Sequence, residues 1–275
     1  MRNLFTFFLV LLLSVTATWA ETPAKQGGVQ VGEASSLRKL VPAEQLERSA
    51  AQQYLQMKQV AAEKRALAPE NHPQLQRLRA IANRILPFTS RFNTRASRWQ
   101  WEVNLIGSSQ LNAFCMPGGK IVFYTGIIDK LKLSDDEIAI VMGHEIAHAL
   151  REHARERIAK TQITHGVASI ASELLSGTKY GSLAQLGLQG GANLLTLKFS
   201  RDNETEADVV GLDLAARAGF DPRAGISLWQ KMGVANKGAP PQWLSTHPAG
   251  NNRIQEMERH LPEVMPLYEA AKVKP

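Results

Sequence analysis

The sequence predicts an α+β protein that is mostly helical and carries one small antiparallel sheet. Three observations lead to this class. Apolar residues recur at helical spacing between Leu75 and Leu86. Residues 101–124 instead alternate with a period of two and are rich in β-branched and aromatic side chains. Ser134 and Glu137 form a capping box that opens a long, largely apolar helix. We therefore expect one sheet among several helices.

The first 36 residues differ from the rest of the chain. Arg2 precedes an almost wholly apolar run, Leu4 to Leu13, and small residues lie at the −3 and −1 positions of a cleavage site after Ala20. Such an apolar core is shorter than the roughly 20 residues that a spanning helix needs. Residues 1–20 are therefore predicted to be a cleaved signal peptide, and residues 21–36 a flexible leader. No cysteine lies near the cleavage site for a lipid anchor. A soluble periplasmic protein is expected.

Composition limits the remaining choices. A hydrophobic content of 44% over 275 residues is enough for a proper core. The single cysteine, Cys115, has no partner within the chain, so packing or a metal must stabilise the fold. The formal charge of +7 suits peripheral contact with the outer membrane, its assembly machinery or acidic clients. Nucleic acid is not an expected partner, because basic and acidic residues are interspersed.

The predicted elements follow the chain in order. Residues 37–69 are expected to form a helical extension, 70–262 the main domain and 263–275 a tail. A left-handed cap is expected at Gly219. The segment 163–197, rich in small residues, is interpreted as a helical hairpin that is either a lid or purely structural. The elements are helices at 42–68 and 72–86, strands at 101–107, 111–115 and 120–124, and helices at 134–160, 200–218, 222–232 and 249–261.

The stretch "MGHEIAHALREH" contains the pattern H-E-x-x-H. His144 and His148 are four residues apart, so both rings lie on one helical face and can meet one ion at about 2.0–2.1 Å. Glu145 projects beside that face, where its carboxylate can reach a metal-bound water. Burying two histidines on an apolar helix without a partner is costly. The pattern therefore favours a metal site over a polar helix.

A catalytic site needs a third protein ligand. A metzincin would continue the motif with a glycine and a histidine, but Arg151 and Ala154 stand there instead. The stretch "SRDNETEADVVG" supplies Glu204 and Asp208 on one helical face, whereas Glu206 points about 200° away. Asp208 can accept a hydrogen bond from the free nitrogen of a ligating histidine. The alternative is an exposed acidic helix start favoured by the helix dipole.

Four stretches in order, "NAFCMPGGKIVFYTGII", "HEIAHALREH", "SRDNETEAD" and "STHPAGNNRI", resemble metallopeptidase family 48. This family includes CAAX prenyl proteases, membrane heat-shock proteases, mitochondrial Oma proteases and periplasmic proteases. The resemblance is closest to stand-alone periplasmic members and covers about residues 70–261. It implies a zincin-like fold with one zinc ion, the ligands His144, His148 and Glu204, and Glu145 as general base.

Other family positions also have counterparts in this chain. The resemblance implies that His247 approaches the zinc, either to stabilise the oxyanion or to occupy the water position at rest. Arg253 matches an arginine of the same motif. Asn112 and Ala113 match the family in "LNAFC", which is either an edge strand that pairs with an extended peptide substrate or an ordinary core strand.

The predicted function is a zinc-dependent endopeptidase that cleaves unfolded or misfolded envelope proteins. The alternative is a zinc-stabilised periplasmic chaperone or outer-membrane assembly factor with little proteolysis. Glu145 favours the enzyme, because a binding module needs no base beside its zinc. His153 and His165 are interpreted as structural, since the ligand count is already met. In this mechanism water is the nucleophile and no covalent intermediate is required, so Cys115 is given no catalytic role.

Overall fold

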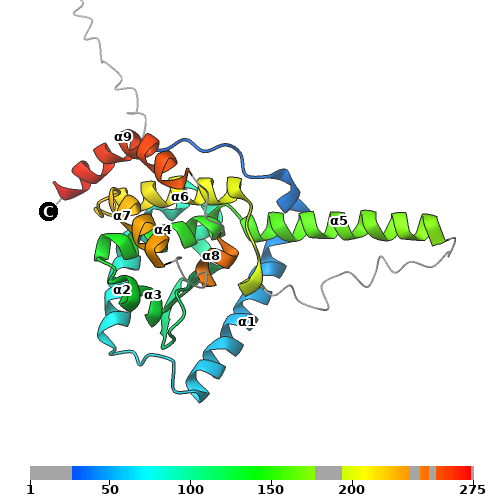
Figure 1. Cartoon of the computed structure of the whole chain (residues 1–275), viewed down its shortest axis with the longest axis horizontal. Coiled ribbons are helices and arrows are strands. Elements are labelled where there is room, and N and C mark those ends of the chain that lie inside the picture. Colours follow the sequence, from blue (N-terminus) through cyan, green and yellow to red (C-terminus); the bar gives the residue numbers. More distant parts are fainter. Residues whose placement is uncertain (1–26, 177–193, 236–241, 248–251, 274–275) are drawn as a thin grey trace, which may run out of the picture.

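The computed structural model describes residues 27–176, 194–235, 242–247 and 252–273. The predicted signal peptide lies outside the described residues, as do residues 177–193 of the predicted hairpin and the side chain of His165. Figure 1 shows a compact body from which one long helix, α5, projects. The α-helices within the described ranges are α1 (Ala43–Glu63), α2 (Pro73–Ile85), α3 (Thr125–Leu131), α4 (Asp135–Leu150), α5 (His153–Ser176), α6 (Arg201–Arg217), α7 (Ala224–Ala235), α8 (Gln242–Thr246) and α9 (Arg253–Lys272). Short 3-10 helices are η1 (Ser36–Leu40), η2 (Leu86–Arg91), η3 (Thr94–Arg98) and η4 (Leu194–Thr196).

One three-stranded sheet accompanies these helices, which confirms the predicted α+β class. Its strands are β1 (Glu102–Ile106), β2 (Ala113–Met116) and β3 (Lys120–Tyr124), in the spatial order β1-β3-β2. The prediction of a purely antiparallel sheet was wrong, because β1 and β3 run parallel while β2 and β3 form an antiparallel hairpin. The second strand of the hairpin, β3, is the one that pairs with β1. The alternation of residues along a sequence does not reveal which strands pair.

Helices α4 and α6 form the centre of the body. Each begins with a capping box in which side chain and backbone satisfy each other: Ser134 with Glu137 in α4, and Ser200 with Asn203 in α6. The helices pack closely at Gly143, where an added Cβ would lie 2.8 Å from the Gly211 carbonyl oxygen. Only glycine permits this approach, so the sequence brings the backbones of α4 and α6 together.

The predicted helix at 134–160 is two helices. Glu152 has a φ of 58°, in the left-handed region, and this residue separates α4 from α5. The chain turns there, and α5 leaves the body (Figure 1). Gly219, with a φ of +76°, follows α6 as expected. Helix α9 is longer than predicted, since it continues through Pro262 and Pro266 into the residues assigned to the tail.

The segment 27–41 packs against α6 and against the turn between α4 and α5. The backbone N–H of Val29 donates to Asp213 of α6 over 3.0 Å, and both residues are buried. Arg38 of η1 pairs with Glu152 at 2.7 Å, beside the turn between α4 and α5. Among the described residues, no helix combines the length and apolar character required to cross a membrane.

Candidate metal centre

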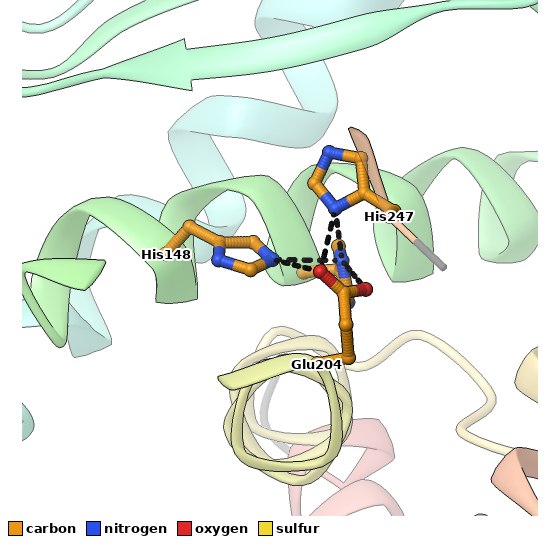
Figure 2. A group of neighbouring side chains, drawn as sticks. His148, Glu204 and His247 are labelled. Carbon is orange, nitrogen blue, oxygen red and sulfur yellow. Dashed lines mark hydrogen bonds and ion pairs between the residues drawn. The ribbon is translucent and has the colours of Figure 1, made fainter. Parts of the chain in front are cut away.

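Four side chains from three parts of the chain converge in the interior. His144 and His148 lie on α4, Glu204 lies on the first turn of α6, and His247 follows α8. Figure 2 shows His148 pointing from its helix toward Glu204, with the His247 ring facing the same point from the other side. One ligand atom from each of the four lies within 4.8 Å of the others, and all four residues are buried.

Four of the spacings between these atoms are close to the edges of a tetrahedron. His144 Nε2 lies 3.1 Å from His148 Nε2 and 3.3 Å from His247 Nδ1. Glu204 Oε1 lies 3.1 Å from His247 Nδ1 and 3.5 Å from His148 Nε2. A zinc ion with ligands at about 2.0–2.1 Å would space them about 3.3–3.4 Å apart. The three nitrogens and one carboxylate therefore fit zinc in both distance and chemistry.

His144 is held by a carboxylate on its other nitrogen. Its Nδ1 lies 2.9 Å from Asp208 Oδ1, which directs Nε2 toward the cluster. Burial disfavours a charged ring, but the hydrogen bonds to Asp208 and Glu204 outweigh burial and raise the pKa of His144 to about 9. A carboxylate behind a histidine makes the ring a stronger ligand and fixes its tautomer. The structure thus gives Asp208 the contact expected from its spacing to Glu204.

Arg253 links Glu204 and Asp208 of α6. It donates to both carboxylate oxygens of Asp208 at 2.6 Å and to Glu204 Oε2 at 2.7 Å. Its guanidinium lies 3.9 Å from the ring centre of Trp229 and is itself buried. Burial alone would raise the pKa of Asp208, but the charge of Arg253 and the bond to His144 lower it. Arg253 therefore keeps these carboxylates ionised and oriented.

Glu145 lies beside the cluster and contacts α8. Its Oε1 accepts a hydrogen bond from Trp243 Nε1 over 2.6 Å and lies 3.7 Å from His247 Nε2. The Trp243 ring stacks on His247, with centroids 5.0 Å apart. Sequence reasoning did not identify Trp243, because α8 is only five residues long and carries no periodic pattern. Its one signal was its position four residues before His247.

His148 has partners that the sequence analysis did not assign. Its ring stacks on Phe199 with centroids 4.0 Å apart. Its Nδ1 lies 2.9 Å from His153 Nδ1, and His153 Nε2 lies 2.7 Å from Glu206 Oε2. His153 was interpreted as structural, and Glu206 was expected to point away from the site. The turn at Glu152 brings His153 back to α4, where Glu206 can reach it.

Asn112 and Ala113 lie beside the cluster on the strand side. Both line a cavity that also contacts Glu145, His148 and Phe199. Strand β2 is one of the two outer strands of the described sheet, and Figure 1 places the sheet below α4 in that view. Burial raises the pKa of the neighbouring Cys115 thiol well above its usual value, and the charge of Glu145 adds to this effect. A neutral thiol is a poor nucleophile, which agrees with giving Cys115 no catalytic role.

Comparison with known proteins identifies related sequences. The sequence profile of peptidase family M48 matches residues 72–261. The chain is 35% identical over 199 residues to the mitochondrial metalloendopeptidase OMA1 of Schizosaccharomyces pombe, covering 72% of this chain and 56% of that protein. It is 38% identical over 153 residues to the Arabidopsis thaliana protein of the same name, covering 56% of this chain and 30% of the relative.

A bacterial relative has a different name. The chain is 30% identical over 172 residues to the beta-barrel assembly-enhancing protease of Escherichia coli, covering 59% of this chain and 35% of that protein. Across the three relatives, the match spans between 30% and 56% of their length. The residues matched by the family profile, 72–261, include all four side chains of the candidate metal centre.

Proposed function

The chain belongs to peptidase family M48, as its motifs predicted, and from this premise we propose that it is a zinc-dependent endopeptidase. His144, His148 and Glu204 are the proposed ligands, and Glu145 is the proposed general base. The observation that carries this assignment is the near-tetrahedral spacing of buried donor atoms with a carboxylate beside them. The identity of the metal rests on that spacing and on the mixed nitrogen and oxygen donors.

Each residue has a defined task in peptide hydrolysis. Zinc, when bound, lowers the pKa of a coordinated water and polarises the peptide carbonyl. Glu145 accepts the proton of the attacking water and delivers it to the leaving amine. Asp208 and Arg253 keep His144 and Glu204 oriented. No covalent enzyme intermediate is needed.

His247 has a proposed regulatory task. Its Nδ1 lies 3.3 Å from His144 Nε2 and 3.1 Å from Glu204 Oε1, which is the spacing of two ligands on one zinc ion. His247 would therefore fill the fourth position of a tetrahedral zinc. Of the two roles considered from the sequence, this geometry supports the resting ligand. Trp243 holds the base in the same arrangement. Both side chains must move before water and a peptide can enter.

The proposed substrates are unfolded or misfolded proteins of the cell envelope. Strand β2 has a free edge within the described sheet, and its start lines the cavity beside Glu145. An extended peptide can add to such an edge through backbone hydrogen bonds, with little demand on sequence. Asn112 and Ala113 are the proposed contacts. The periplasmic location is proposed from the signal sequence, and the outer membrane or its assembly machinery is the proposed contact surface.

Hydrolysis of an unfolded protein tests this function. We expect the mature protein to cut casein at internal bonds, to lose this activity with chelator and to regain it with zinc. Glu145→Gln should bind stoichiometric zinc yet lose about 10²- to 10⁴-fold in rate, the usual contribution of a general base. Loss of zinc from this variant would contradict the role of Glu145. Stepwise trimming from one terminus would indicate an exopeptidase instead.

Two further measurements address location and selectivity. Sequencing the N-terminus of the protein from a periplasmic fraction should give Glu21 as the first residue, and a protein retained in the cytoplasm would refute export. A stable globular protein should survive incubation while its destabilised variant is cut. Equal rates for the two would rule out the proposed preference for unfolded chains.

The filled fourth position also fits the alternative function, a zinc-stabilised chaperone or assembly factor with little proteolysis. In that case the wild-type protein would suppress aggregation of an unfolded client, and Glu145→Gln would do so equally well. Cleavage by the wild-type protein and its loss in the variant would exclude this alternative.

A further inference from the structure

A hydrogen-bonded chain reaches the proposed ligand His148 from behind. His148 Nδ1 lies 2.9 Å from His153 Nδ1, and the two ring centres are 4.9 Å apart. His153 Nε2 lies 2.7 Å from Glu206 Oε2. His153 is 1% exposed, so water does not compete for its bond to His148, whereas the Glu206 side chain is partly exposed. The path runs from α4 through the first residue of α5 to α6.

Arg151 fixes the far end of this path. It contacts Glu206 Oε1 with two nitrogens, at 2.9 Å from Nε and 2.6 Å from the terminal nitrogen, and it also donates to the Gly32 carbonyl. Arginine carries only donors, so these contacts require the Glu206 carboxylate in its accepting form. The carboxylate is therefore ionised and can only accept hydrogen bonds.

The accepting carboxylate of Glu206 determines which ring nitrogens of His153 and His148 carry a hydrogen. Since Glu206 accepts, Nε2 of His153 must carry the hydrogen of that bond. A neutral His153 then has a lone pair on Nδ1, which accepts from the Nδ1–H of His148. The remaining nitrogen of His148, Nε2, is left with its lone pair, and this is the atom directed at His144 and Glu204.

We infer that His153 and Glu206 are positioning residues that set the tautomer and orientation of His148 for zinc. This inference rests on the proposed zinc site. It gives α6 three carboxylates with distinct tasks. Glu204 faces the metal, Asp208 supports His144 directly, and Glu206 supports His148 through an interposed imidazole. Carboxylates behind ligating histidines typically change metal affinity or activity by about 10- to 100-fold.

Zinc affinity, measured by competition with a chelator, tests the inference. His153→Phe removes both nitrogens and should weaken zinc binding about 10- to 100-fold. His153→Asn retains an oxygen near the position of Nδ1 that can accept from His148, so it should recover part of this loss. Glu206→Gln should fall between wild type and His153→Phe. The absorption spectrum of the cobalt-substituted protein should change in the same order.

Glu152→Gln is the matched control. It lies in the same turn and breaks the ion pairs to Arg38 and Arg155 without touching His148. It should lower the Tm of the chelator-treated protein but leave zinc affinity unchanged. If His153→Phe does not fold, His153→Asn and Glu206→Gln still decide. Wild-type affinity in both, or equal loss in Glu152→Gln, would overturn the inference. A wild-type protein that binds no zinc would instead overturn the proposed function.

Discussion

The two halves of the candidate metal centre are held in different ways. The helical half consists of α4 and α6, whose backbones meet at Gly143 and Gly211. The C-terminal half consists of α8, His247 and the start of α9. Helix α8 is joined to its surroundings by backbone hydrogen bonds from Trp243 to Leu111, at 3.0 Å, and from Phe199 to Thr246, at 3.1 Å. A close-packed interface fixes three donors, whereas a short helix presents the fourth.

Because of this difference, we expect the helical half to retain the metal and the C-terminal half to control access of water and peptide to it. Cores at near-crystalline density resist displacement, so the donors on α4 and α6 keep their mutual distances. We therefore expect the fourth donor, which follows α8, to exchange more readily than the other three. Arg253 is the exception, since it comes from the C-terminal half but bonds to two carboxylates of α6. Four sets of variants test whether the two halves differ in this way.

The largest effect is expected for Arg253→Met. Removing the guanidinium leaves Glu204 and Asp208 buried without their cation, and breaking such a pair typically costs about 3–5 kcal/mol. Urea denaturation should show this loss in the free energy of unfolding. Arg259→Met, on the same helix but in an exposed pair with Glu256, should change stability by less than about 0.5 kcal/mol. Similar losses in both variants would argue against the special role of Arg253.

The next effect concerns the helical half. In Gly143→Ala the new methyl group would meet the Gly211 backbone at 2.8 Å, and backbone atoms cannot rotate away. Overpacking of this kind costs about 1–3 kcal/mol, and the shift of α6 should weaken zinc binding as well. Gly233→Ala in α7 meets nothing within 4 Å and should stabilise the helix by about 0.5–1 kcal/mol. Denaturation curves that move in the same direction would contradict the close packing.

The two halves should also differ in how much each donor contributes to zinc affinity. Glu204→Gln should weaken binding more than His247→Ala, because water can take the position of His247 whereas the donor on α6 has no substitute. His247→Ala should in addition shorten any lag before casein cleavage, since the fourth position is then open. Equal zinc affinities in the two variants, measured by chelator competition, would remove the distinction between fixed and exchangeable donors.

The smallest effect is expected at the start of α4. Burial alone would raise the pKa of Glu137, but Lys231, the Ser134 backbone and Ser227 lower it. A folded pKa below the unfolded value of about 4.3 stabilises the protein above that pH, and the contribution disappears as the pH falls through the folded pKa. Glu137→Gln should cost about 1 kcal/mol at pH 7. The difference in Tm from wild type should shrink as the pH falls through the acidic range and vanish once the carboxylate is protonated in the folded protein, and a constant difference would contradict the assignment.

Local patterns predicted the helical half well. The capping box at Ser134, the i and i+4 spacing of His144 and His148 and the left-handed Gly219 all depend on neighbours in sequence. The structure reproduces each of them. The predicted metalloendopeptidase class also agrees with the names of the OMA1 relatives. These features could be read from the chain because short-range chemistry determines them.

The remaining features depend on contacts between distant residues. The parallel pairing of β1 with β3 and the Trp243 bond to Glu145 have no local signal. The left-handed conformation of Glu152 was equally hidden, because a non-glycine residue rarely adopts it. Without that turn, His153 could not be placed behind His148. Helical geometry alone therefore gave no sign of the contact between Glu206 and His153 across the helix interface.

The projecting helix α5 begins beside the candidate metal centre and extends away from the body. Its 24 residues span about 36 Å at 1.5 Å per residue. His153 is its first residue, and Arg38 pairs with Glu152 in the adjoining turn. A rotation of α5 about this end that moved the far end by several ångströms would displace the His153 ring by only a small fraction of that distance. We therefore expect rotations of α5 to reach His148 only in strongly reduced form.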